Sequence, residues 1–140
     1  MADLVKSQAA PVLLTTRFEE IARLFLHTRH EEIYVSTPEG DFAGAISLHD
    51  IKPYLNDPAV AAHVIAGDLL RDDVPPVALR APLAEALRVF AQHAGQTLPV
   101  VESAQGRLAG ILVKNDLLLA LLEGRGAEKR GDTQAPWRTS

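Results

Sequence analysis

Asp50 and Asp116 are the residues of this chain whose position most suggests ligand chemistry. They end two similar stretches, residues 41–50 and 107–116, and each stretch has a glycine just before it and another inside it. A short apolar run after a turn glycine predicts the second strand of a hairpin, so each aspartate falls in the first turn of a predicted helix, residues 48–55 or 115–122. There a carboxylate can accept hydrogen bonds from both vicinal hydroxyls of a ribose, while N–H groups of the first helical turn face a phosphate.

A purely structural role explains the same two aspartates. Ser47 precedes Asp50 by three residues, which is the spacing of a capping box, and the helix dipole stabilises an acidic residue in a first turn. The second corner has Val113 at the corresponding position and therefore lacks this hydroxyl. Lys114 there could offer a counter-charge to a phosphate or simply be solvated. At the first corner, His49 would attract a phosphate more weakly near neutral pH. Both interpretations stay open at the level of the residues.

Other motifs indicate neither a metal site nor catalysis. His27 and His30 are three residues apart, with Glu31 following, but no third ligand stands at a defined offset, so a polar helix end near the negative dipole explains them better. The sequence has no cysteine, no nucleophile motif and no glycine-rich phosphate loop ending in Lys-Ser/Thr. We therefore expect a protein that is not an enzyme and needs no cofactor.

Composition limits the remaining classes. A chain of 140 residues with 47% hydrophobic content forms one compact domain or two small interlocked ones. A net charge of -4 does not attract a polyanion, so nucleic acid is disfavoured as the main partner. The absence of cysteine is compatible with a reducing cytosol, and no apolar run is long enough for a membrane span, so we expect a soluble, cytoplasmic chain.

The chain contains one pattern twice, at an offset of 65 residues before the hairpin turn and 66 after it. Helical apolar positions align as Phe18, Ile21, Ala22 and Phe25 with Leu83, Ala86, Leu87 and Phe90. Gly40, Gly44 and Asp50 align with Gly106, Gly110 and Asp116. Each unit reads strand, helix, strand, strand, helix, and is too small to bury its sheet alone, so we expect an α+β fold in which two units share a core.

The predicted elements of the first unit are a strand at 11–14, a helix from 17 to about 30, strands at 33–36 and 42–47, and a helix at 48–55. Thr16 is expected to cap the first helix, with Glu19 completing a capping box. A further helix at 59–66 is expected to start at Asp57 and Pro58. Residues 68–76 are expected to form a connector, and residues 1–10 a lead-in without a clear period. The pattern restarts with a strand at 76–79.

The repeat resembles a pair of CBS domains, which occur in tandem as a regulatory module. The resemblance is carried by Leu98-Pro99-Val100-Val101 with Gly106, Gly110 and Asp116 in the second copy, and by Gly40, Gly44, Ser47 and Asp50 in the first. It covers about residues 10–122, and the departures are Val113 in place of Ser or Thr and Tyr34 in place of proline. The resemblance implies two β-α-β-β-α repeats packed through their sheets with pseudo-two-fold symmetry. The implied boundaries are 10–57 for repeat 1, 58–75 for a connecting helix and linker, 76–122 for repeat 2 and 123–140 for a disordered tail.

The same resemblance implies a regulatory ligand, an adenine nucleotide such as ATP, ADP or AMP, bound in a cleft between the repeats. The aspartates would hold the ribose, and the starts of the middle strands would wall the base pocket. The implied nucleotide-binding residues are Asp116, Lys114, Asn115, Val113, Asp50, Ser47, His49, Tyr34, Ile33, Leu98 and Pro99. Ile33 and Leu98 could equally be ordinary core residues, and Tyr34 could either stack on a base or fill its pocket.

The wider expectation is a homodimer whose nucleotide state modulates an attached domain. Residues 28–35, 46–51 and 64–69 resemble the CBS pairs at the cytoplasmic C-terminus of ClC-type chloride channels and transporters, which implies an attached transmembrane domain and a place at the cytosolic face of a membrane. Two alternatives stay open: a ligand-free dimerisation scaffold, or a sensor of metal or another small ligand, using Asp72 and Asp73, in a different parent protein.

Overall fold

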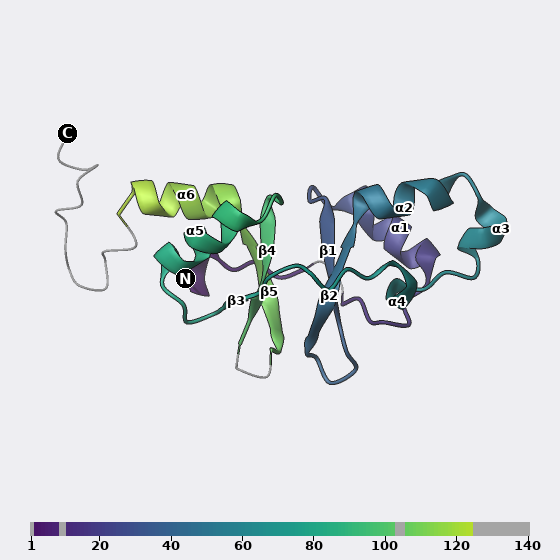
Figure 1. The fold of residues 1–140 in the computed structure, drawn as a ribbon, viewed down its shortest axis with the longest axis horizontal. Helices are drawn as coiled ribbons and strands as arrows, with labels where there is room; N and C mark the ends of the chain where they lie inside the picture. The colour runs from purple at the N-terminus through teal and green to yellow at the C-terminus, as the bar shows by residue number, and fades with distance from the viewer. Residues whose placement is uncertain (1, 9–10, 103–105, 125–140) are drawn as a thin grey trace.

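A computed structural model describes residues 2–8, 11–102 and 106–124. Figure 1 shows two units whose strands face each other in the middle of the molecule, with the helices of each unit on the outer side. The first unit contains α1 (Phe18–His27), β1 (Glu32–Ser36), β2 (Phe42–Ser47) and α2 (Leu48–Leu55). The second contains β3 (Val77–Ala78), α5 (Leu83–Gln92), β4 (Thr97–Val101), β5 (Leu108–Val113) and α6 (Lys114–Leu122). The predicted α+β class and the two hairpins with their following helices are confirmed. The predicted tail lies outside the described residues from position 125 onward.

The two sheets are small and differ in one strand. β1 and β2 pair antiparallel, whereas β3, β4 and β5 form a three-stranded sheet in which β3 runs parallel to β4. The predicted strand at 11–14 is reduced to a single parallel bridge between Leu13 and Ser36, with Ser36 N donating to Val12 O at 2.9 Å. This bridge corresponds by the repeat offset to the pair Ala78 and Val101 of the second sheet.

The predicted cap of the first helix is wrong. α1 starts at Phe18 after Arg17, and no side chain caps it. Thr16 instead accepts a hydrogen bond from Leu13 N at 2.9 Å, so its hydroxyl closes the preceding turn. The helix also ends at His27 rather than near His30, because Thr28 is already extended.

The predicted helix at 59–66 is also wrong in length, because tertiary bonds divide it. The structure has α3 (Pro58–Ala61) and α4 (Ala66–Leu69), and Asp57 caps α3 as predicted, accepting from Val60 N at 3.3 Å. Between the helices, Val64 O accepts from Phe18 N at 3.0 Å, and Ala66 N donates to Thr16 O at 2.8 Å. These bonds to the segment before α1 replace the bonds that one continuous helix would make.

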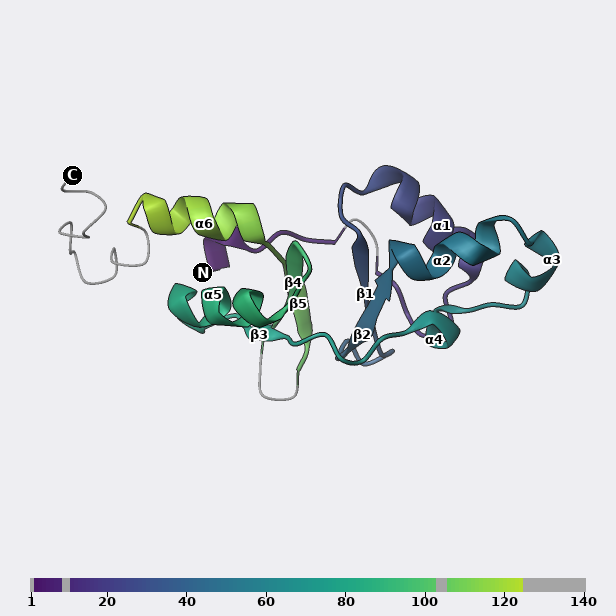
Figure 2. The same ribbon diagram turned by 45° about the horizontal axis from the view of Figure 1, so that its top comes forward.

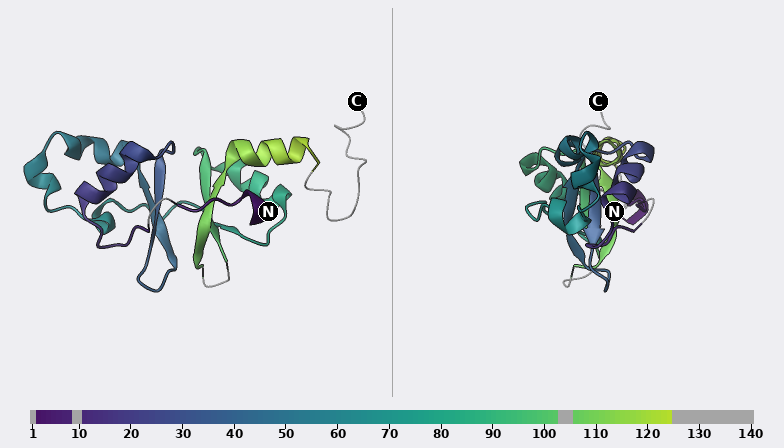
Figure 3. Two further views of the ribbon diagram at one scale, coloured as in Figure 1. Left: turned by 180° about the vertical axis from the view of Figure 1, so that it is seen from behind. Right: turned by 90° about the vertical axis from the view of Figure 1, so that its right-hand side faces the viewer.

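Two segments connect the units and cross from one to the other. We call residues 2–8 and 66–74 the lead segments. Residues 2–8 correspond to residues 67–73 at the offset of 65, and the two segments contain the 3₁₀ helix η1 (Ala2–Leu4) and α4, respectively. Lys6 and Ile111 exchange backbone hydrogen bonds of 2.9 and 2.7 Å, and Arg71 and Ala45 exchange bonds of 2.8 and 2.9 Å. The first lead segment therefore pairs with β5 of the second unit and the second with β2 of the first unit, and Figures 2 and 3 show both crossing between the units.

The glycine inside each hairpin strand is explained by these crossings. A Cβ on Gly44 would lie 2.4 Å from the carbonyl oxygen of Arg71, and one on Gly110 would lie 2.5 Å from that of Lys6. No side chain fits under the crossing backbone, so both strands require glycine at the same repeat position.

Three clusters of buried residues hold the molecule together. One core fills each unit; Leu4 of the first lead segment belongs to the core of the second unit, and Leu69 of the second lead segment to that of the first. The third cluster, with Tyr34, Ala45 and Ile111 at its centre, lies between the sheets.

The hairpin turns add symmetric backbone bonds between the units. Phe42 N donates to Gly106 O at 2.7 Å, and Leu108 N donates to Gly40 O at 3.0 Å. These pairs are equivalent under the repeat, as a pseudo-two-fold axis requires. Within the described ranges, no helix combines the length and apolar character needed to cross a bilayer.

Candidate functional site

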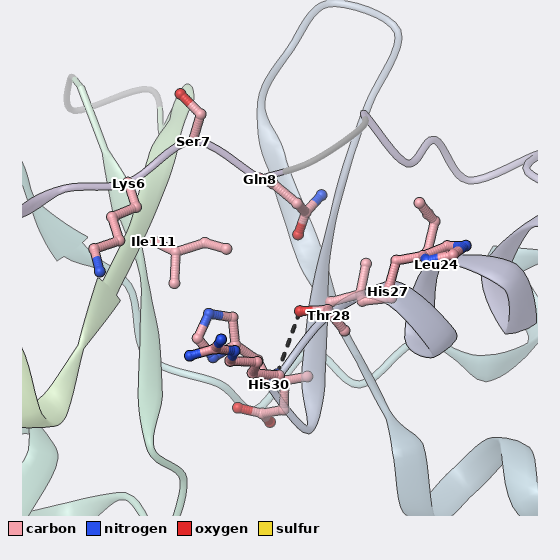
Figure 4. Close-up of a pocket in the computed structure, with 11 residues that line it drawn as sticks. Lys6, Ser7, Gln8, Leu24, His27, Thr28, His30 and Ile111 are labelled. Atoms are coloured by element: carbon pink, nitrogen blue, oxygen red, sulfur yellow. Dashed lines mark hydrogen bonds between the residues drawn. The ribbon is translucent and has the colours of Figure 1, made fainter.

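A pocket of about 310 Å³ opens between the two units on the side of the first lead segment. Its walls are residues 6–8 of that segment, Leu24 and residues 27–30 at and after the end of α1, the start of β1, and Ile111 of β5. Figure 4 shows Lys6 and Ile111 on the second-unit side and Leu24, His27 and Thr28 on the first-unit side, with His30 at the base between them. The pocket is thus formed by both units and by the segment that connects them.

Asp116 adjoins this pocket through Lys6. The Lys6 ammonium lies 3.0 Å from Asp116 Oδ2, an ion pair between a largely exposed lysine and a half-buried carboxylate. The pair does not meet hydrogen-bond geometry, and Oδ2 is buried without a hydrogen-bond partner among the described residues. The ammonium at 3.0 Å offsets the charge of Oδ2 without a well-directed hydrogen bond. A hydroxyl donor from a ligand would supply the hydrogen bond that this oxygen lacks.

Asp50, the equivalent aspartate, is held differently. Arg71 Nε lies 2.6 Å from Oδ2 and Nη2 lies 3.2 Å from Oδ1, so one guanidinium contacts both oxygens. The hydrogen bond to Asp50 and the charge of that carboxylate raise the pKa of Arg71, and Asp73 and Glu32 act in the same direction. Both aspartates therefore have a basic partner from a lead segment, but only Asp50 is fully hydrogen-bonded.

At the start of each helix beside the aspartates, the first backbone N–H already donates to a carbonyl of the same chain. Lys114 N donates to Gln96 O at 2.8 Å, and the equivalent Leu48 N donates to Glu31 O at 2.8 Å. Ser47 caps α2 by accepting from His49 N at 3.2 Å, whereas Val113 gives α6 no side-chain cap. Asn115 and His49 are exposed. A phosphate would therefore depend on side chains such as Lys114 more than on the first N–H of either helix.

The four predicted base-pocket residues differ in whether they reach the pocket. Ile33 lines the pocket, while Leu98 and Pro99 are fully buried in the sheet. Tyr34 has no exposed surface; its hydroxyl lies 2.6 Å from Thr97 Oγ1 and its ring contacts Phe42 edge-on. Burial raises the pKa of Tyr34, so the phenol stays protonated. Tyr34 thus fills the space between the sheets, and a nucleotide contact by these residues stays a prediction.

The groups considered for metal binding are not assembled around a common point. His27 and His30 line the pocket and Glu31 is exposed next to them, while Asp72 and Asp73 are exposed on the second lead segment. Across residues 2–8, 11–102 and 106–124, no group of three or more His, Cys, Asp or Glu side chains is arranged to hold a metal ion.

Reasoning from the sequence missed the contribution of the lead segments. Lys6, Gln8, Arg29 and Arg71 were not expected at the site, yet Gln8 holds β1 through Nε2 to Tyr34 O (2.9 Å) and Oε1 to Tyr34 N (2.7 Å). Extending the repeat alignment back by a few residues would have paired Lys6 with Arg71 and Leu4 with Leu69. That signal was present in the sequence.

Comparison with known proteins agrees with this architecture. The family model of the CBS domain matches residues 66–123, from α4 through α6. No curated protein sequence matches the chain.

Solved structures are similar over most of the chain. A CBS domain pair/ACT domain protein from Thermotoga maritima has a TM-score of 0.72 at 24% identity, covering 88% of this chain and 96% of that one. CBSX2, solved in complex with AMP, has a TM-score of 0.72 at 22% identity, covering 89% and 96%. The cytosolic domain of the Mg²⁺ channel MgtE, solved with ATP, has a TM-score of 0.68 at 24% identity, covering 84% of this chain and 46% of that one. The chain therefore has the fold of a CBS domain pair, and its residues 66–123 match the CBS domain family.

Proposed function

We propose that this chain is a regulatory module that binds an adenine nucleotide in the pocket beside Asp116 and changes the packing of its two units in response. The observation that carries the proposal is the buried Oδ2 of Asp116, next to a pocket formed by both units. This oxygen is ion-paired with Lys6 but has no hydrogen-bond partner among the described residues. A ribose hydroxyl would satisfy that oxygen. Two proteins of the same fold have been solved with AMP or ATP, which supports this ligand class.

The proposed response works through the first lead segment. A ribose hydroxyl that donates to Asp116 competes with the Lys6 ammonium, 3.0 Å from the same oxygen. Lys6 is also bonded through its backbone to Ile111 on β5, so a change at its side chain is transmitted to the segment that ties the units together. Regulation needs only different affinities for two arrangements, with a coupling of about 1–3 kcal/mol. No bond is made or broken, and we propose no catalytic role and no required cofactor.

The proposed assembly is a homodimer through the outer helices. Leu118, Leu119 and Leu122 of α6 are exposed, as is Leu87 of the neighbouring α5. An apolar surface of this kind on helices that already cover their own sheet is suited to a second copy of the chain.

The parent of the module is proposed from sequence alone. Attachment to a ClC-type chloride channel or transporter, on the cytosolic side of a membrane, rests on the resemblance of residues 28–35, 46–51 and 64–69. The three structures cited above include a domain of a Mg²⁺ channel and no chloride channel.

A ligand-free dimerisation scaffold is the second candidate. It is favoured by Tyr34, which fills the space between the sheets, and by the basic partner that each aspartate already has. In that case the lead segments would serve only to lock the two units.

Thermal melting with ATP, ADP, AMP and GTP at equal concentrations separates the two candidates. A nucleotide present at 100 times its Kd stabilises the fold by about 2.7 kcal/mol, and we expect this for at least one adenine nucleotide but not for GTP. Asp116→Asn should remove the stabilisation while leaving the unliganded melt largely unchanged. A melt that no adenine nucleotide shifts would contradict nucleotide sensing and favour the scaffold.

A further inference from the structure

The two aspartate corners are equivalent in sequence but differ in what their carboxylates can still accept. Arg71 contacts both oxygens of Asp50, at 2.6 and 3.2 Å. A guanidinium fork matches a carboxylate and leaves little room for a diol to replace it. Asp116 faces a single ammonium at 3.0 Å, and its buried Oδ2 has no hydrogen-bond partner among the described residues. One carboxylate is already satisfied, and the other is open to a donor.

The charges around the corners differ in sign as well. Arg71 interacts electrostatically with Asp50, Asp73 and Glu32, so it has three acidic neighbours. Of these, Glu32 also lies in the wall of the pocket beside Asp116. Such surroundings repel a phosphate if Arg71 is drawn away from Asp50.

Among the charged and titratable residues that line the pocket beside Asp116, basic ones predominate. It is lined by Lys6, His27, Arg29 and His30. At the repeat-equivalent positions of His27, Arg29 and His30, the second unit has Gln92, Ala94 and Gly95, respectively. The one acidic residue in its wall, Glu32, lies 3.5 Å from His93 Nε2 of the second unit. In a chain with a net charge of -4, this concentration of basic groups on one side favours an anion there.

From these differences we infer that the two clefts have diverged: the chain binds one nucleotide, with its ribose at Asp116 and its phosphates toward Arg29, and the Asp50 cleft is closed by Arg71 and binds none. This inference rests on the proposed function and deepens it, because it assigns the ligand to one cleft and names the residue that selects for phosphate. The Arg71–Asp50 pair is then a structural clamp that fixes the second lead segment on β2.

Isothermal titration of the full chain with ATP tests the assignment. The expected stoichiometry is one ATP per chain. Asp116→Asn should weaken binding at least tenfold, while its matched variant Asp50→Asn should keep the stoichiometry at one ATP per chain and the affinity within twofold of the wild type. Two ATP per chain, or a loss of binding in Asp50→Asn with Asp116→Asn unaffected, would overturn the inference and leave nucleotide binding itself intact.

The phosphate assignment has its own control. Arg29→Gln should weaken the binding of ATP at least tenfold and that of adenosine less than twofold. The control is Arg88→Gln, on the exposed face of α5 and paired with Glu85, which should change neither affinity. Equal weakening of ATP and adenosine in Arg29→Gln would contradict the role of Arg29.

Methyl NMR of the wild-type chain covers the case in which a variant fails to fold. Added ATP should shift Ile33 and Ile111 and leave Ile51 of α2, the neighbour of Asp50, in place. Shifts confined to Ile51 would reverse the assignment. If the wild type binds no ATP in either experiment, and neither ADP nor AMP shifts its thermal melt, the proposed function fails, and this inference with it.

Discussion

Gly44 and Gly110 are the residues at which one added carbon should have the largest effect. Gly110→Ala would place Cβ 2.5 Å from the carbonyl oxygen of Lys6, so either β5 or the first lead segment must move. Overpacking of this kind costs about 1–3 kcal/mol, and we expect a loss of that size in the free energy of unfolding by urea. Gly67→Ala is the control, because its Cβ would lie 3.4 Å from Leu14 O. Equal stability of Gly110→Ala and the wild type would contradict the crossing.

Tyr34 and Thr97 test the contact between the units. Tyr34→Phe leaves Thr97 Oγ1 buried without this partner and should reduce the free energy of unfolding by about 1–3 kcal/mol. In the Thr97→Val background, Tyr34→Phe should reduce the free energy of unfolding by much less. A double-mutant cycle by urea denaturation measures this difference. Additive effects would show that the two groups do not interact.

The pH dependence of Tyr34 follows from its burial. Because burial raises its pKa in the folded protein above its value in the unfolded chain, the stabilisation is complete below the unfolded pKa and is lost as pH rises above about 10. Ultraviolet titration should show one tyrosine that ionises only together with unfolding, and this signal should be missing in Tyr34→Phe. If both tyrosines ionised near the ordinary tyrosine pKa of about 10 while the chain stayed folded, the burial of Tyr34 would be contradicted.

At the scale of elements, the lead segments have the largest structural role. Leu4 of the first segment is buried in the core of the second unit, and Leu69 is its equivalent in the first. Leu4→Ala should destabilise the protein by about 2 kcal/mol or more, as large-to-small changes in cores do. Leu26→Ala, at a side chain that is 81% exposed, should change stability by about 0.5 kcal/mol or less. Similar urea midpoints for the two variants would contradict the docking of residues 2–8.

The elements also show what the sequence could and could not predict. Both hairpins and the helices after them were predictable, because turn glycines, apolar runs and the duplication all agree there. The cap at Thr16 was not predictable, because its hydroxyl accepts from Leu13 N and closes the preceding turn instead. The length of the 59–66 helix was not predictable either, because Phe18 N and Ala66 N make backbone bonds between distant segments, and these override local signals. At the site, the aspartates were recognisable, but their partners Lys6 and Arg71 depend on how the lead segments cross between the units.

For the whole molecule, the exposed leucines of α6 predict association. A double variant, Leu119→Lys with Leu122→Lys, should shift the chain from dimer to monomer in analytical ultracentrifugation, because two charges would have to be buried at the proposed interface. The control is the double variant Leu55→Lys with Val60→Lys, which places the same charges on exposed apolar residues at the opposite end of the molecule and should leave the dimer intact. A monomeric wild type, or a dimer unaffected by the α6 charges, would refute this interface.

The central claim, that an adenine nucleotide binds at the Asp116 corner, is tested most directly by a crystal structure of the chain grown with saturating ATP. We expect one nucleotide per chain in the pocket between the first lead segment and α1. Its ribose hydroxyls should lie within hydrogen-bond distance of Asp116, with Lys6 displaced and Arg71 still on Asp50. An empty pocket, or a nucleotide whose ribose lies away from Asp116, would contradict the account.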